Sequence, residues 1–272
     1  MESKNIKGYL FLLPSLIGFA FLYFIPFVAG IKYSFNRSGF DTTFVGFKNY
    51  QDIFASFAFR TAFKNTAIFM LISIPLIIVI SFVLALIIHE IKTPRFVKFF
   101  IILPIVIPSA GVAGFFRKAF GEGGLDLLYT KYAMVIVILI FIWKNTGYNL
   151  ILYLAGLSQI NKGQIEAAMI DGASYIQKLR HIIIPLCTPT TVFVVILSII
   201  NSFKIFKDVY ILQGKYPNIN IYMLQHYMTN KFREFNYEKL TATAYVFSIV
   251  IFISALLFLL LDKRYQRRVG EE

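Results

Sequence analysis

Six apolar runs, each long enough to cross a bilayer as a helix, constrain the fold more than any other feature of this sequence. A bilayer core about 30 Å thick needs roughly 20 helical residues. Apolar residues make up 58% of the 272 residues and charged residues only 15%, which is outside the range of soluble domains. The sequence therefore predicts an all-α integral membrane protein with six transmembrane helices. The runs occupy residues 8–31, 65–89, 99–116, 132–157, 182–203 and 240–261.

The distribution of charge argues against nucleic-acid binding. The net charge is +13, but Lys and Arg are dispersed between the apolar runs and form no stripe on a soluble face. Positive residues that flank membrane spans near anionic headgroups explain the excess. A single cysteine, Cys187, excludes an internal disulfide, and three histidines far apart in sequence do not suggest a ligand set. No metal site is therefore expected.

The segment between the fourth and fifth runs is too polar to cross a bilayer. Asn161 with Gln164, and Ser174 with Gln177, each place a capping side chain three residues before a Gln, which indicates a helix start. Gly172 can adopt the left-handed conformation that ends a helix. The segment is therefore predicted to form two short helices separated by a tight turn and held outside the membrane.

Motifs in this segment also carry a family resemblance; they are Glu166-Ala167-Ala168, Asp171-Gly172-Ala173, Ile182 and Pro185. In residue type and spacing they resemble the EAA loop of permease subunits in binding-protein-dependent ABC importers. Residues 46–50 (GFKNY), 103–104 (LP) and 153–157 (YLAGL) resemble the carbohydrate-uptake branch of these permeases, the maltose and glycerol-3-phosphate type. The similarity covers nearly the whole chain.

The resemblance implies a function, a coupling site and partners. In that family the EAA loop is a cytoplasmic coupling helix that docks into a cleft of the ATPase subunit. An ordinary amphipathic connector is the alternative for this loop. The resemblance further implies alternating access together with a second, non-identical permease, two ATPase subunits and an extracytoplasmic sugar-binding protein, in a bacterial cytoplasmic membrane. It assigns ATPase coupling to Glu166, Ala167, Ala168, Asp171 and Gly172.

The chain itself carries no recognisable catalytic or nucleotide-binding motif. It has no G-x-x-x-x-G-K-[ST] loop that could hold phosphates. No Ser/His/Asp arrangement, H-E-x-x-H motif or carboxylate pair suggests an enzyme. Because active transport needs an energy source, ATP and Mg²⁺ are expected on the partner ATPase, and this chain is expected to bind no cofactor.

Polar residues inside the fourth and fifth runs are the candidates for the substrate pathway. Asn145, Tyr148 and Asn149 share one side of a helix by their spacing. Tyr and Asn together suit the apolar faces and hydroxyl groups of a sugar. Asn201, near the end of the fifth run, is the remaining candidate, and interhelical hydrogen bonding is the alternative for each of the four. Lys204 is expected to snorkel to the interface rather than to face an anion.

Two other classes of membrane protein are weighed against this interpretation. A stand-alone secondary transporter should carry an intramembrane Asp or Glu, and the six runs contain neither. A membrane-embedded enzyme is disfavoured because the sequence shows no catalytic site. An ABC permease for another small solute remains an alternative. Lys4 and Lys7 precede the first run, which lacks a cleavage site, so a retained span is expected.

The expected organisation has three parts. Residues 1–64 form an N-terminal span and an external loop, residues 65–262 a five-span core with the EAA loop at 158–186, and residues 263–272 a basic cytoplasmic tail. Both termini are expected in the cytoplasm. This orientation follows from the resemblance, because the positive-inside rule supports it only weakly.

Overall fold

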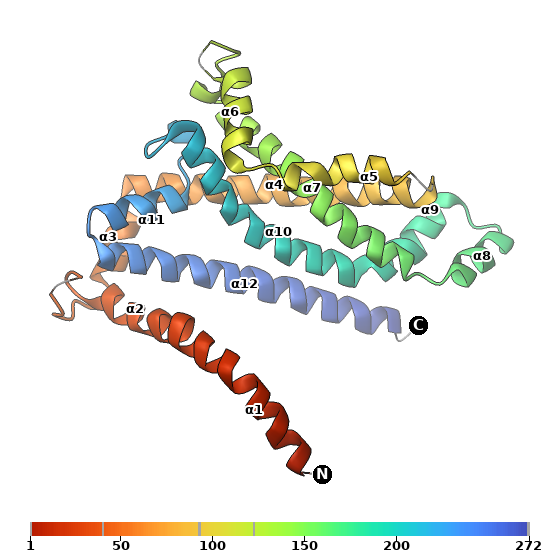
Figure 1. Ribbon diagram of the computed structural model, residues 1–272, viewed down its shortest axis with the longest axis horizontal. Helices are drawn as coiled ribbons and strands as arrows, with labels where there is room; N and C mark the ends of the chain where they lie inside the picture. The colour runs from red at the N-terminus through yellow and green to blue at the C-terminus, as the bar shows by residue number, and fades with distance from the viewer. Residues whose placement is uncertain (1, 40, 92–93, 122, 271–272) are drawn as a thin grey trace. The chain divides into compact units, whose positions relative to one another are not determined.

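The computed structural model of the protein describes residues 2–39, 41–91, 94–121 and 123–270 (Figure 1). Within these ranges the regular structure is helical, apart from one isolated bridge between Asn36 and Phe44. Short 3-10 or π-helical turns join several of the α-helices. The α-helices are α1 (Glu2–Phe19), α2 (Ile25–Phe35), α3 (Lys48–Ala55), α4 (Phe57–Glu90), α5 (Arg95–Ile102), α6 (Ser109–Phe120), α7 (Ala133–Ser158), α8 (Lys162–Ile170), α9 (Tyr175–Lys178), α10 (Ile184–Gln213), α11 (Leu224–Arg233) and α12 (Tyr237–Gly270).

The prediction of an all-α membrane protein with six transmembrane helices is confirmed in its fold class, with five to six candidate spans. By length and composition, five helices of the described chain could cross a membrane, and the number is six if one bent pair of helices counts as a single span. The first loop is shorter than predicted, because α2 continues to Phe35 and α4 already begins at Phe57. The predicted tail is helical as far as Gly270, and residues 271–272 lie outside the described residues. The five continuous candidates are Leu10–Phe35, Phe57–Glu90, Ala133–Ser158, Tyr175–Gln213 and Tyr237–Leu260.

The span predicted over residues 99–116 is not one continuous helix. Phe96–Ile105 and Ser109–Phe120 meet at an angle of 89°. Pro104 lies in a 3-10 turn, and Pro108 has an extended backbone (φ −57°, ψ 140°) immediately before α6. Proline lacks a backbone N–H and disfavours helical geometry at the residue before it, so two prolines four residues apart interrupt the hydrogen-bond ladder.

Two other spans that contain proline stay continuous because a π-helical turn precedes the proline. A π-helical turn, Ala20–Phe24, ends two residues before Pro26, and another, Leu179–Ile183, ends two residues before Pro185. In both turns the backbone N–H of the next residue donates to the carbonyl five positions earlier. The wider turn accommodates the ring and the missing donor without breaking the helix.

The chain divides into two compact units, each made of two separate segments of the sequence. The first unit comprises Met1–Arg60 with Tyr227–Ile249, and the second comprises Thr61–His226 with Val250–Glu272. In the first unit the side-chain amide of Asn49 donates to the carbonyls of Ser34 (3.0 Å) and Asn36 (2.7 Å). Part of the stretch 46–50 therefore stabilises the fold next to α2.

In the second unit, α7 packs against α10 and α5. The rings of Phe69 and Phe141 meet edge to face with centroids 5.3 Å apart. Gly147 on α7 permits close approach to α5, because a Cβ at this position would lie 2.8 Å from the Cα of Ile102. This tight packing fixes the position of the polar residues on the middle of α7.

Candidate functional site

The predicted turn of the EAA loop forms with the local geometry that its sequence indicates. The side chain of Asn161 accepts a hydrogen bond from the backbone of Gly163 at 2.9 Å and begins α8. Gly172 has φ +76°, and its N–H donates to the carbonyl of Met169 at 3.1 Å. The N–H of Ala173 donates to the carbonyl of Ala168 at 2.9 Å, which completes a Schellman motif. The left-handed conformation predicted for Gly172 is confirmed.

The second helix of this turn begins as predicted but is not short. Ser174 and Gln177 form a complete capping box, with bonds of 3.3 Å and 2.7 Å. The helix then continues from Tyr175 to Gln213 without interruption. The prediction of a second short helix is wrong, because the π-helical turn before Pro185 maintains the helix where proline would otherwise break it. We call residues 161–178 the knob.

The knob is exposed and presents apolar side chains. In Figure 1 it lies at one end of the second unit, beyond the ends of α7 and α10. None of the residues of α8 is buried. Ile170 is 87% exposed and Ile176 72% exposed. Glu166, Ala167, Asp171 and Gly172 are also exposed, and Ala168 is half-buried.

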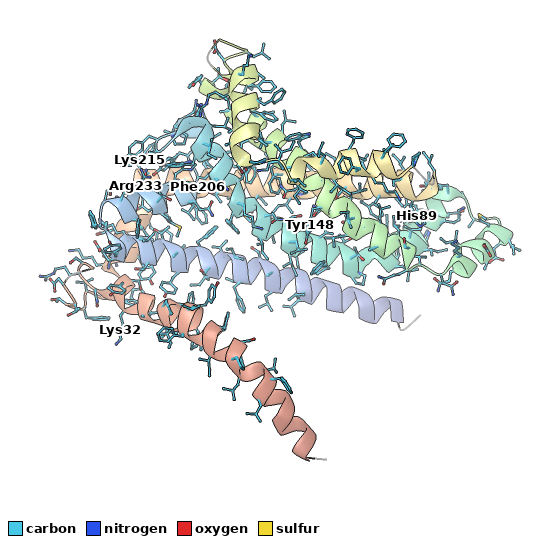
Figure 2. The ribbon with its side chains drawn as sticks, viewed as in Figure 1. Lys32, His89, Tyr148, Phe206, Lys215 and Arg233 are labelled. Atoms are coloured by element: carbon cyan, nitrogen blue, oxygen red, sulfur yellow. The ribbon has the colours of Figure 1, made fainter. Side chains whose placement is uncertain are left out.

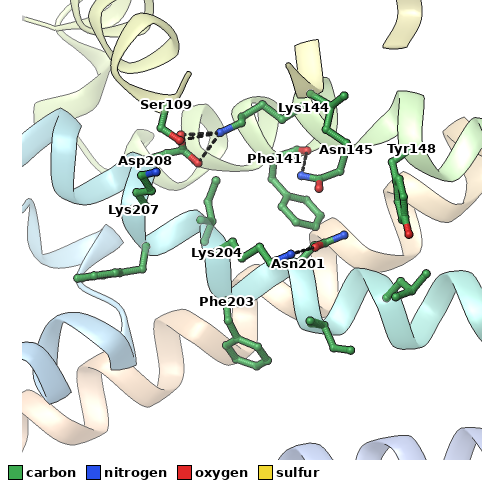
Figure 3. A pocket seen from close by; sticks show the side chains of 15 residues that line it. Ser109, Phe141, Lys144, Asn145, Tyr148, Asn201, Phe203, Lys204, Lys207 and Asp208 are labelled. Atoms are coloured by element: carbon green, nitrogen blue, oxygen red, sulfur yellow. Dashed lines mark hydrogen bonds and ion pairs between the residues drawn. The ribbon is translucent and has the colours of Figure 1, made fainter. Parts of the chain in front are cut away.

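A cavity in the second unit lies between α7 and α10, beside the bend between α5 and α6 (Figure 3). Its volume is about 590 Å³. Tyr148, one of its lining residues, lies between Phe206 and His89 along the unit (Figure 2). Ten residues separate Tyr148 from the end of α7, or roughly 15 Å, which is about half a bilayer core. The polar lining residues are Ser109, Lys144, Asn145, Tyr148, Asn201, Lys204, Lys207 and Asp208.

A buried ion pair crosses this cavity and was not anticipated from the sequence. The Nζ atom of Lys144 on α7 lies 2.8 Å from Oδ1 and 3.1 Å from Oδ2 of Asp208 on α10. It also donates to the hydroxyl of Ser109, the first residue of α6, at 3.1 Å. Side-chain exposure is 16% for Lys144 and 5% for Asp208. The pair joins three helices where the third span bends.

The ion pair corrects the expectation that the membrane helices contain no acidic residue. The fifth apolar run ends at residue 203, whereas α10 continues to Gln213 and includes Asp208. Lys144 inside an apolar run was the available signal, since a charge at membrane depth requires a partner. Its partner lies 64 residues away in the chain, so sequence spacing could not identify it.

The structure separates the four candidate pathway residues. Asn145, Tyr148 and Asn201 line the cavity. The amide of Asn145 donates to the carbonyl of Phe141 at 2.8 Å, and the amide oxygen of Asn201 accepts from Lys204 at 2.8 Å. Asn149 is buried instead, and its amide donates to the hydroxyl of Ser198 at 3.1 Å between α7 and α10. Asn149 thus has the geometry of interhelical hydrogen bonding, the alternative considered for these residues.

The described residues contain no group of His, Cys, Asp and Glu side chains that could hold a metal ion.

Residues 79–271 match the family model of the binding-protein-dependent transport system inner membrane component. The chain belongs to this family. The permease resemblance of the EAA segment is therefore confirmed at the level of the family.

Relatives of this permease match over nearly its whole length. A probable ABC transporter permease of Pyrococcus horikoshii is 31% identical over 93% of this chain and 97% of its own. The arabinooligosaccharides transport system permease protein AraP of Bacillus subtilis is 30% identical over 97% of this chain and 91% of its own. AraP of Halalkalibacterium halodurans is 27% identical over 98% of this chain and 90% of its own.

A solved structure confirms the fold of the permease. A chain of a bacterial ABC transporter involved in the import of the acidic polysaccharide alginate aligns with a TM-score of 0.82 at 22% identity. The alignment covers 96% of each chain. The permease therefore has the same overall fold as that chain.

Proposed function

We propose that this chain is a membrane subunit of a sugar-importing ABC transporter, in which the knob couples solute movement to ATP hydrolysis on a partner chain. Curated relatives with a named solute support the choice of carbohydrate. They include the arabinooligosaccharide permeases, a lactose transport permease of Rhizobium radiobacter and an sn-glycerol-3-phosphate permease of Yersinia pestis. A cavity lined by amide, hydroxyl and aromatic groups suits a sugar.

One observation carries the coupling role. A single unbroken helix, Tyr175–Gln213, begins in the knob and also supplies the wall of the cavity. Tyr175 and Asn201 lie 26 residues apart, or roughly 39 Å along the helix axis. A displacement of the knob therefore reaches the cavity through one rigid element. Closure of an ATPase dimer against the knob would move α10 relative to α7 and change access to the solute.

The knob has the surface of a docking element. Beside its turn lies a hollow of about 360 Å³ lined by Ala168, Asp171, Gly172 and neighbouring residues. Exposed Ile170 and Ile176 provide apolar area that an ATPase cleft would cover. In this proposal both termini and the knob face the cytoplasm, a second permease completes the pathway, and an extracytoplasmic binding protein delivers the sugar. ATP and Mg²⁺ bind only to the two ATPase subunits.

Replacing Glu166 with Lys tests the coupling role. The exposed carboxylate would become a cation at the docking surface, so we expect at least a tenfold loss of solute-stimulated ATP hydrolysis in the reconstituted complex. Membrane insertion of the chain should not change. Gln164→Lys is the control, because it introduces the same cationic side chain on the opposite side of α8. Full uptake by the Glu166→Lys variant would contradict the coupling role.

A further inference from the structure

The cavity between α7 and α10 carries more positive charge than it neutralises. Lys144, Lys204 and Lys207 line it, and Asp208 is the sole carboxylate among its described lining residues. The formal charge of the lining is therefore +2. Since Lys144 is held by Asp208 at 2.8 Å, the excess resides on the other two lysines.

The two surplus lysines lack an anionic partner within the described part of the chain. The ammonium group of Lys204 donates to the neutral amide oxygen of Asn201 at 2.8 Å. Lys207 takes part in none of the ion pairs among the described residues, and both lysine residues are exposed. A cation at membrane depth costs free energy unless water or an anion meets it. The cavity provides both access and space for such an anion.

The direction of Lys204 argues against the snorkelling predicted from the sequence. Nine residues, or more than two helical turns, separate Lys204 from Gln213 at the end of α10. Its side chain extends back to Asn201, toward the middle of α10 and away from that end (Figure 3). A snorkelling lysine would extend toward the nearer interface. Lys204 instead points its charge along the cavity.

We propose that the cavity binds an acidic saccharide and that Lys204 and Lys207 pair with its carboxylate or phosphate. This inference rests on the proposed function and narrows its substrate class. Lysine binds both kinds of anion as a mobile point charge, whereas Asn145, Tyr148 and Asn201 can bind the hydroxyls and sugar face. A neutral sugar would leave two ammonium groups uncompensated in the cavity.

Matched probes in the full complex test this proposal. The chain is reconstituted in phosphatidylcholine liposomes with the second permease, the two ATPase subunits and the binding protein. Stimulation of ATP hydrolysis is compared for digalacturonate against neutral galactobiose, and for glucose 6-phosphate against glucose. At least one acidic probe should exceed its neutral counterpart, and the pair that responds distinguishes carboxylate from phosphate.

Lysine variants connect the response to the cavity. The Lys204→Gln/Lys207→Gln double variant should reduce stimulation by the acidic probe at least tenfold, and Lys204→Arg/Lys207→Arg should retain most of it. Lys131→Gln, an exposed lysine outside the lining, is the matched control and should respond as the parent does. Assembly of every variant is checked by size-exclusion chromatography.

Several results would overturn the proposal. Stimulation by neutral probes alone, or equal acidic responses in the parent and the Gln double variant, rejects the acidic substrate and leaves the proposed transport function standing. If the two lysines bind lipid headgroups instead, added phosphatidylglycerol should change ATP hydrolysis in the parent but not in the Gln double variant. Both proteins should then respond equally to the four probes, which would also reject the acidic substrate. Absence of stimulation by all four probes rejects the acidic substrate, and failure to assemble with the ATPase rejects the proposed function as well.

Discussion

At the scale of single residues, the ion pair between Lys144 and Asp208 makes a specific prediction. Removing one partner of a buried pair leaves an uncompensated charge and typically costs about 3–5 kcal/mol. We therefore expect Asp208→Asn to lower the thermal stability of the purified chain strongly. The double change Lys144→Met/Asp208→Leu should be much milder, because it removes both charges together. Unfolding in detergent, followed by tryptophan fluorescence, measures both losses, and equal losses would show that an uncompensated charge is not what destabilises Asp208→Asn.

His226 provides a pH-dependent test outside the membrane spans. Burial lowers the pKa of His226 to about 4. Its Nδ1 accepts a hydrogen bond from the backbone of Met223 at 3.2 Å, so protonation would place a second proton against that N–H. The ordinary pKa of histidine is about 6.5, so below this pH the unfolded chain binds a proton at His226 that the folded chain excludes. The free energy of unfolding therefore falls as the pH falls from about 6.5 to about 4.

The size of this effect is on the order of 3 kcal/mol over that pH range, since one unit of pKa corresponds to about 1.4 kcal/mol. As the pH is lowered over this range, the melting temperature of His226→Gln should fall less than that of the parent. His89→Gln, the same substitution at an exposed histidine, is the control for the amino-acid change itself. If all three proteins lose stability in parallel, the burial of His226 has no titration consequence.

At the scale of elements, the turn between α8 and α9 depends on backbone conformation at Gly172. A Cβ there would meet no atom within 4 Å, so φ +76° is the only local constraint. Gly172→Val should destabilise the turn by about 1–2 kcal/mol and reduce solute-stimulated ATP hydrolysis. Gly172→Asn, which tolerates the left-handed region, should be milder. Equal activity of the two variants would show that the knob does not need this conformation.

At the scale of the whole molecule, neighbouring residues on α7 should have separable effects on transport and assembly. Tyr148 lines the cavity, so Tyr148→Ala should reduce uptake by reconstituted vesicles while the complex still assembles. Asn149 is buried and its side chain is hydrogen-bonded to Ser198, so Asn149→Ala should lower the stability of the complex by about 1–3 kcal/mol. Assembly and uptake should therefore fall together. Uptake and size-exclusion profiles measure both effects, and a loss of assembly in Tyr148→Ala would reject its place in the pathway.

The sequence alone determined the features that depend on local chemistry. Apolar length predicted the spans, and the capping residues Asn161 and Ser174 with Gly172 predicted the geometry of the turn. These features could be predicted because each depends on interactions within a few residues or on the burial of a continuous apolar run. The family resemblance of the EAA segment relies on the same local motif.

Proline shows where local inference ends. Pro75 and Pro189 lie inside continuous helices, whereas Pro104 and Pro108 accompany an 89° bend. The amino acid is the same, but repair of the helix depends on neighbouring turns and helices. Sequence could therefore predict proline-containing spans without identifying the one that breaks.

Only the tertiary structure decided the composition of the cavity. The pairing of Lys144 with Asp208 and the burial of Asn149 beside Ser198 both depend on how α7 faces α10. Helical spacing places Asn145 and Asn149 on one side of α7, but it does not show which of them meets a neighbouring helix and which meets open space. These contacts join residues 64 and 49 positions apart and arise only when the helices pack, and that packing separated the cavity residues from the structural ones.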